Sequence, residues 1–380
     1  MIFNNLPVYI LLLVIATIEI SWGDNVTSSV KLLADSFYKI LAKNDNLIFS
    51  PLGAHAILSL AYAGAGGKTA SSLRNILKLP YRRKLADEYE AILDNLYSVK
   101  NITVNFANKI YVQNNYKLQR NFKEIAKTYF DADVETINFK NNNAAAKKIN
   151  NWAKKKTKNK VNTLVDGDDF DDRTEAILLN AIYFKANWSY SVNEGKTSRE
   201  KFFISRTKYI LRPMMHINGR FGYTENARLG AKILKMNYGN EMFAMYIILP
   251  DYRLGLKMLE KKLAHIDVNH LVKGMKKTVK VVIPKFKLES TLELNDPLEK
   301  IGLGEIFSKN ADFSGMIEHG KKLKIQKVVQ KAVIEVDERG TKAAEEHGLQ
   351  LDVNFRRAEL KGQVSNTTIL FVGRVVKPHY

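Results

Sequence analysis

The chain has 380 residues, of which 46% are hydrophobic and 26% charged, so it is long and apolar enough to form a globular core. It contains no cysteine, which excludes disulfide bonds and thiol chemistry. The formal net charge of +20 favours a polyanionic partner of the heparin type, although a basic surface that is only solvated would carry the same charge. Nucleic acid is not an expected partner, because no nucleic-acid-binding motif accompanies the charge.

The N-terminal end carries an apolar run at residues 8–18, which is too short to cross a membrane as a helix. Ser21 and Gly23 then place small residues at the two positions that a signal peptidase reads. A buried N-terminal helix is the alternative interpretation of this run. We predict a signal peptide at residues 1–23, followed by a soluble, secreted, extracellular chain at residues 24–380 with no membrane segment.

Four N-x-S/T sequons occur, at Asn25, Asn101, Asn187 and Asn366. Asn25 lies in a polar stretch and is the favoured glycan site, whereas Asn187 lies in an apolar stretch and is expected to be buried. We therefore predict glycosylation at Asn25, Asn101 and Asn366.

The first elements are helical. Apolar spacing predicts an amphipathic helix over residues 30–41, followed by a short strand at 47–49. Ser50 and the proline after it are typical of a helix start, and the helix from residue 52 to about 62 is apolar on nearly every side, so it should be buried. The glycine-rich residues 64–69 lack the spacing of a nucleotide-binding loop and follow a helix instead of a strand, which excludes a phosphate site there.

The rest of the chain alternates helices and strands without a repeat or a low-complexity linker. Residues 71–98 are expected to form short helices. Residues 174–188 are continuously apolar, which predicts a central strand of a large sheet. Further helices are predicted at 122–129, 144–158, 254–264 and 295–302, and further strands at 103–112, 133–139, 231–236, 242–249, 278–283 and 369–376. This pattern indicates one α+β domain.

One segment, residues 329–357, has the properties of both a strand and a loop. Residues 329–336 alternate as a sheet strand would, and a charged turn with Gly340 follows. The period of two then resumes, and it would place these side chains on one face of a strand: Thr341, Ala343, Glu345, His347, Leu349, Leu351 and Val353.

The motif E-x-G-T-x-A-A from Glu338 through Gly340, Thr341 and Ala343 to Ala344 resembles the hinge of the serpins. Other serpin-like motifs follow one another in the family's order, at residues 46–69, 149–160, 178–188, 213–221, 281–290, 298–316 and 369–378. They cover nearly the whole chain after residue 23. The resemblance implies an α+β serpin fold with three β-sheets, about eight to nine helices and an exposed reactive-centre loop at about 338–357, and we expect a monomer.

The resemblance also implies a mechanism and its residues. In serpins a serine protease cleaves the loop, forms an acyl-enzyme and is dragged across the protein as the loop inserts into the main sheet. By analogy, Glu338 and Lys285 form the ion pair where insertion starts, with Trp188 packed beside them. Three residues would form a hydrogen-bonded cluster beneath the sheet: Ser50, Asn180 and Gln330.

Three positions depart from the family's pattern in this region. Gly53 stands where the family has serine, and Gln330 where it commonly has histidine, so the cluster is expected to be weakened. Asn159 replaces the family's usual glycine.

The loop itself carries two residues that oppose insertion. Glu345 stands where the family prefers alanine, and His347 where it prefers a small residue. Burying an unpaired carboxylate costs several kcal/mol, which predicts leakage toward simple substrate cleavage. The family's spacing selects the bond from Asn354 to Phe355, whereas the side chain best suited to a trypsin-like protease is Arg356. The predicted reactive bond region is therefore Asn354, Phe355, Arg356 and Arg357.

Residues 358–368 are polar and about ten residues shorter than the apolar return strand with Pro-Phe that serpins have at this point. The loss of one buried strand is expected to expose core. A divergent or alternative last exon, a gene-model error, or a specialised non-inhibitory protein would each explain it.

The sequence thus predicts a secreted suicide-substrate inhibitor of a trypsin- or chymotrypsin-like serine protease. A non-inhibitory carrier, binding or decoy serpin, which is cut as a substrate, is the alternative. Neither a G-x-S-x-G nor an H-E-x-x-H motif is present, so we do not expect an enzyme, a metal site or a cofactor.

Overall fold

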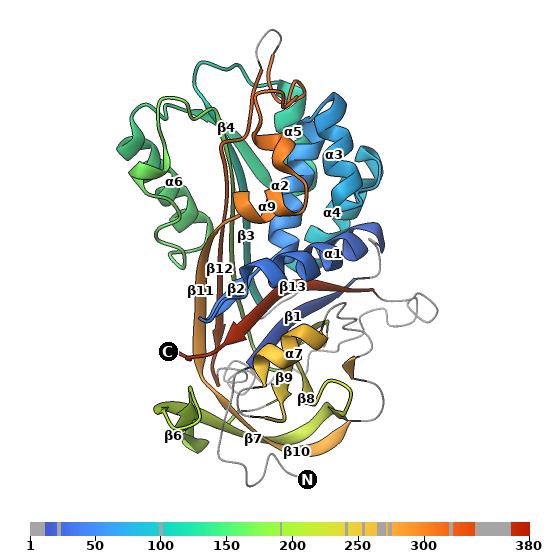
Figure 1. Cartoon of the computed structure of the whole chain (residues 1–380), viewed down its shortest axis with the longest axis vertical. Helices are drawn as coiled ribbons and strands as arrows, with labels where there is room; N and C mark the ends of the chain where they lie inside the picture. Colours follow the sequence, from blue (N-terminus) through green and yellow to red (C-terminus); the bar gives the residue numbers. More distant parts are fainter. Residues whose placement is uncertain are drawn as a thin grey trace, which may run out of the picture.

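Two β-sheets organise the structure, which is a computed structural model (Figure 1). It describes residues 12–20, 24–98, 102–190, 192–239, 242–252, 255–263, 271–272, 276–318, 322–338 and 366–380. Among these residues no helix combines the length and the apolar character needed to cross a bilayer.

The smaller sheet has five strands, in the order β11 (Phe286–Glu293), β12 (Lys327–Val336), β5 (Ala176–Ala186), β3 (Ile102–Gln113) and β4 (Ala132–Ile137). As predicted for a central strand, β5 is buried along nearly its whole length. It pairs with β3 in the antiparallel direction but with β12 in the parallel direction. The prediction of a strand at residues 329–336 is confirmed by β12.

The two faces of this sheet belong to two apolar cores. Ala332 and Ile334 of β12 point into the main core, whereas Val329 and Val333 pack with Ile149 of α6 (Asn142–Lys156). The strand therefore alternates sides as its sequence predicts. Figure 1 shows α6 on one face of the sheet and the α2 to α5 group on the other.

The larger sheet contains eight strands. Seven follow the order β10 (Lys277–Pro284), β7 (Tyr209–Asn226), β8 (Ala231–Asn237), β9 (Phe243–Pro250), β1 (Leu12–Ile20), β13 (Asn366–Val375) and β2 (Leu47–Phe49), and β6 (Thr197–Phe203) pairs with β7. The first part of β7 pairs with β6 and β10, and its last part pairs with β8. Because β7 pairs with strands at both of its ends, two of the three predicted sheets are joined into one eight-stranded sheet in this structure.

Eight α-helices lie in the described part of the chain: α1 (Asp24–Leu41), α2 (Pro51–Gly64), α3 (Gly67–Leu77), α4 (Arg82–Ser98), α5 (Arg120–Phe130), α6, α7 (Leu256–Lys262) and α9 (Asn295–Lys300). Ser50 begins α2 as predicted, because its hydroxyl accepts a hydrogen bond from the backbone N–H of Gly53 at 3.1 Å. Every residue of α2 except Ala63 is buried. Residues 82–98 form one long helix in place of the expected short ones.

The N-terminal apolar run has an unexpected place. Residues 12–20, which lie within the predicted signal peptide, form β1 between β9 and β13. The expected exposure of core beside the last strand is wrong for β13, because Leu370 and Phe371 are fully buried. The strand that lies between β9 and β13 in this sheet is β1, from the N-terminal end of the chain.

Candidate functional site

The parallel contact between β5 and β12 is the first feature of the candidate site. Residues 177–184 of β5 pair with 327–334 of β12, and we call these paired residues the parallel seam. Along the other edge of β12, residues 329–336 pair with β11. A chain that turned back after β12 would run antiparallel to both strands of the parallel seam. A strand inserted into the parallel seam would therefore replace one parallel pairing with two antiparallel ones. Antiparallel pairing is also slightly more stable per residue than parallel pairing.

A charged cluster closes the end of the parallel seam where the chain leaves β12. Lys285 Nζ lies 2.7 Å from Glu338 Oε2, and the hydroxyl of Thr197 donates to Glu338 Oε1 at 2.6 Å. Burial works to raise the pKa of the Glu338 carboxyl, but these hydrogen bonds outweigh burial and hold its pKa below the usual value. Glu338 is therefore ionised and anchored at neutral pH.

Asp337, the preceding residue, ties the same end to three other segments. Its side chain lies 2.7 Å from Lys185 Nζ on β5 and accepts a hydrogen bond from the Tyr380 hydroxyl at 2.8 Å. Its backbone carbonyl accepts from Trp188 Nε1 at 2.9 Å, and the Trp188 ring stacks on Tyr238 with centroids 4.4 Å apart. The end of β12 is thus fastened to β5 and to the C-terminal residue.

The cluster predicted beneath the sheet lies in the middle of the parallel seam. Gln330 and Asn180 are register partners across it, and the Gln330 amide donates to Asn180 Oδ1 at 3.0 Å. Gln330 also accepts from the Ser50 N–H at 2.8 Å and donates to the Ser50 carbonyl at 2.9 Å. The Asn180 amide in turn donates to Asn108 Oδ1 at 2.9 Å. We call these four residues the mid-seam cluster; all lie in the buried interior.

Two positions that depart from the family's pattern lie at this cluster. A side chain on Gly53 would place its Cβ 2.3 Å from Asn180 Oδ1, so any residue larger than glycine would require Asn180 to shift. Gln330 satisfies both backbone groups of Ser50 and one amide oxygen of Asn180. Asn108 Nδ2, in contrast, is buried without a hydrogen-bond partner among the described residues, so the expected weakening of the cluster stays a prediction.

The third departure lies after α6. Asn159 has a φ of 64°, in the left-handed region where asparagine is tolerated better than most other residues. The backbone conformation that would suit the family's glycine is thus kept.

The contributors to the site that were not predicted from the sequence include Asn108, Lys185 and Thr197. Each lies far from its partners along the chain, and none belongs to a sequence motif that would have pointed to it. Their strands were partly predicted, but strand pairing was not, so no signal in the sequence alone could have joined them to the site.

The hinge and reactive bond residues fall outside the described residues, namely Gly340, Thr341, Ala343, Ala344, Glu345, His347, Asn354, Phe355, Arg356 and Arg357. Asn101 also lies outside them. Asn25 lies in α1, and its side-chain nitrogen, which a glycan would occupy, donates to Glu88 Oε1 at 2.7 Å. Asn366 begins β13, and Asn187 is half-buried.

Comparisons with known proteins agree with this geometry. A family model described as "Serpin (serine protease inhibitor)" matches residues 28–378. Antichymotrypsin-2 of Bombyx mori is 33% identical over 298 residues, which are 78% of this chain and 78% of that protein.

Solved structures are similar as well. The crystal structure of Serpin48 from the insect Tenebrio molitor has a TM-score of 0.81 at 29% identity and covers 93% of this chain and 98% of that one. Human thyroxine-binding globulin in complex with its ligand has a TM-score of 0.80 at 25% identity and covers 94% and 100%. The motifs, the fold and these matches agree over nearly the whole length. The chain belongs to the serpin family.

Proposed function

We propose that this protein inhibits a serine protease as a suicide substrate, through cleavage of the loop after Glu338 and insertion of that loop into the parallel seam. Relatives named as an antichymotrypsin, an antitrypsin and a serine protease inhibitor support the inhibitor class. The observation that carries the mechanism is that β12 and β5 are parallel neighbours, with the loop beginning directly at the end of β12.

The two clusters fit the two steps that insertion requires. The ion pair of Lys285 with Glu338 stands at the entrance, so it must yield before the first loop residues enter. The mid-seam cluster bridges β5 and β12 at Asn180 and Gln330, so it must open for the strand to pass. Both hold the sheet in its five-stranded form until cleavage releases the loop.

The target class follows from the predicted reactive bond region. Arg356 and Arg357 suit a trypsin-like protease, and Phe355 suits a chymotrypsin-like one. We propose trypsin-like proteases first, because two adjacent arginines offer two acceptable bonds.

An incubation with bovine trypsin and chymotrypsin tests the proposal. A complex that survives SDS, together with a large rise in Tm after loop cleavage, is expected. Loop cleavage with neither a complex nor a rise in Tm would overturn the inhibitor function.

Two variants provide a matched control. Ala343→Arg places a charge on the predicted inserting face and should abolish the complex while cleavage continues. Ala344→Arg places the same charge on the other face and should largely preserve the complex. Equal behaviour of the two variants would argue against insertion in this register.

The second candidate is a non-inhibitory serpin that binds a ligand or serves as a decoy. Glu345 on the predicted inserting face supports it, since an unpaired carboxylate opposes insertion. The trypsin experiment separates the two candidates, because a non-inhibitory serpin is cut without trapping the protease.

We further propose that a sulfated polyanion of the heparin type binds the basic residues at the end of α6 and after it. Lys154, Lys155 and Lys158 are exposed there. Their charges add to the strongly positive balance of the chain, which attracts polyanions over a distance set by the ionic strength.

A further inference from the structure

The strand β1 is paired along both of its edges. Residues 12–20 pair with 366–375 of β13, and residues 13–18 pair with 243–248 of β9. β9 and β13 do not pair with each other in the described residues, because β1 separates them. Without β1, two inner edges of the larger sheet would face an empty strand position.

The side chains of β1 belong to the core. Val14, Ile15 and Ile18 are fully buried within the main apolar cluster. An apolar run that served only to direct export would need no particular partner for each residue. Here each of these side chains has a fixed place between two strands.

The polar residues of β1 are also matched. The Thr17 hydroxyl donates to the backbone carbonyl of Ala244 at 3.3 Å. The backbone N–H of Glu19 donates to the carbonyl of Met242 at 2.8 Å, and its carboxylate lies 3.3 Å from Lys235 Nζ. Hydrophobicity alone does not produce such partners, so β1 fits its position in register as well as in composition.

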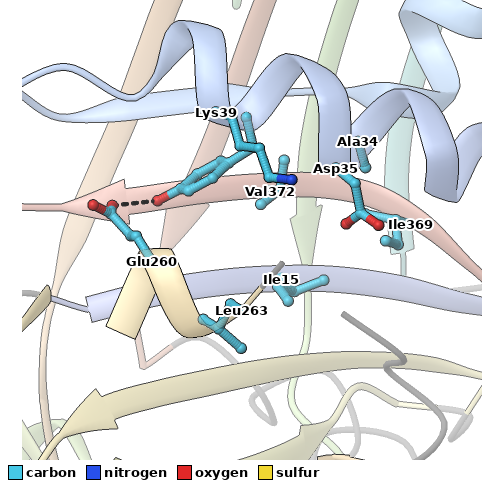
Figure 2. Close-up of a pocket in the computed structure, with 9 residues that line it drawn as sticks. Ile15, Ala34, Asp35, Lys39, Glu260, Leu263, Ile369 and Val372 are labelled. Atoms are coloured by element: carbon cyan, nitrogen blue, oxygen red, sulfur yellow. Dashed lines mark hydrogen bonds between the residues drawn. The ribbon is translucent and has the colours of Figure 1, made fainter. Parts of the chain in front are cut away.

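A second layer covers the same strand. Figure 2 shows Ile15 of β1 between Val372 of β13 and Leu263, at the C-terminal end of α7, with α1 above them. The layer is closed by the Tyr38 hydroxyl, which donates to Glu260 Oε1 at 2.7 Å. Ile15 thus lies in the interior, where α1 and the end of α7 meet the sheet.

We propose that residues 12–20 remain part of the folded protein, as the strand that completes the larger sheet between β9 and β13. This proposal goes beyond the inhibitory function and does not depend on it. A signal peptide removed after Gly23, as the sequence predicts, would instead take these residues out of the folded protein. Experiments can distinguish retention of residues 12–20 from their removal.

A pair of engineered cysteines tests the position of β1 in the full chain. Thr17 and Ala244 are register partners, so Thr17→Cys with Ala244→Cys should form a disulfide on oxidation. The chain has no other cysteine, so this bond is the only one that can form. Peptide mapping by mass spectrometry detects it.

The matched control is Ala16→Cys with Ala244→Cys. Residues 16 and 17 point to opposite faces of the strand, so this pair should stay reduced under the same conditions. Closure of the first pair alone supports the proposal. Closure of neither pair, or equal closure of both, would overturn it.

A second measurement does not depend on any variant. The full chain is expressed in a eukaryotic secretory cell, and the folded protein is purified by gel filtration and weighed by mass spectrometry under denaturing conditions. Residues 12–20 should be found, either uncut or as a separate piece that stays bound until denaturation. A folded protein that begins at Asp24 and carries no such piece would overturn the proposal.

Discussion

Lys285 and Glu338 form an ion pair of 2.7 Å at the point where the chain leaves β12, and Glu338 is only 5% exposed. This ion pair anchors the end of β12 beside the parallel seam. The Glu338 carboxylate is removed from water, and Lys285 and Thr197 replace part of its hydration.

Lys285→Met should lower the free energy of unfolding by about 1–3 kcal/mol, since it leaves a buried carboxylate without its cation. Urea denaturation at pH 7 measures the change. The control is Lys287→Met, because Lys287 and Glu289 form an exposed pair at 3.6 Å that should contribute less than about 0.5 kcal/mol. Equal losses in the two variants would contradict a special role for the Lys285 pair.

The same ion pair predicts a response to acid. The pKa of Glu338 is lowered in the folded protein, so its stabilisation is fully present above the unfolded pKa of about 4.3 and is lost as the pH falls through the folded pKa. Part of the loss of stability below about pH 4.5 should therefore disappear in Glu338→Gln. Unfolding curves between pH 3 and pH 6 test this, and identical pH profiles would contradict it.

His55 predicts a separate pH dependence at higher pH. Burial lowers the pKa of His55 from 6.5 to about 3, so the folded protein keeps the ring neutral while the unfolded chain takes up a proton. The stabilisation is complete above about pH 6.5 and falls as the pH drops from 6.5 toward 3. Between pH 7 and pH 5 the loss should be about 2 kcal/mol. His55→Gln should flatten this interval, and an unchanged slope would exclude His55 as its cause.

Regular elements could be predicted from the sequence because their signals are local. The buried α2 follows from a run that is apolar on every side and begins at Ser50, and the central β5 from the continuous run near residues 176–186. The site was less accessible. Glu338 and Lys285 came from the family resemblance, whereas Asn108 and Thr197 became visible only through strand pairing.

The N-terminal apolar run could not be predicted as a strand from its sequence pattern. Residues 12–16 are all apolar, so neither a period of two nor a helical period distinguishes a buried strand from a leader. The strand is identified only by its pairing with β9 and β13, whose residues lie more than two hundred positions away in the sequence. The polar residues 358–368 predict the loss of a strand before residue 369, but they do not predict that β1 pairs with β13.

Gly53 and Asn180 predict a coupled effect on stability. Gly53→Ala should cost about 1–3 kcal/mol, because its Cβ would lie 2.3 Å from Asn180 Oδ1. Asn180→Ala removes that obstacle, so the double variant should lose less than the sum of the two single losses. Thermal unfolding of the three variants measures the coupling. Gly304→Ala is the control, since its Cβ would meet only Glu299 Cγ at 3.7 Å, and strict additivity at Gly53 and Asn180 would contradict the packing.

The proposed polyanion site predicts a localised loss of binding. Replacing Lys154, Lys155 and Lys158 together with glutamine should lower the affinity for immobilised heparin and the salt concentration needed for elution. A control with the same change in net charge replaces three exposed lysines elsewhere, at Lys78, Lys300 and Lys309. Equal losses in both triple variants would show that the net charge, and not this surface, binds the polyanion.

Glu345→Ala should shift the outcome of the protease reaction toward the trapped complex. Insertion must bury the side chain at this position, and an unpaired carboxylate costs several kcal/mol or must first take up a proton. Slow insertion gives the protease time to hydrolyse the acyl-enzyme and leave, so the wild type should release much of the enzyme. The ratio of SDS-stable complex to cleaved protein, measured with trypsin at pH 7.5, should rise several-fold in the variant.

The neighbouring Glu346 provides the control for Glu345. Glu346→Ala removes the same charge from the same loop, but its side chain would point to the other face of the inserted strand. Its ratio of complex to cleaved protein should stay close to that of the wild type. An equal rise in both variants would assign the effect to loop charge, and no rise in either would show that Glu345 does not slow insertion. Because only burial distinguishes the two positions, the difference between these variants measures insertion of the loop directly.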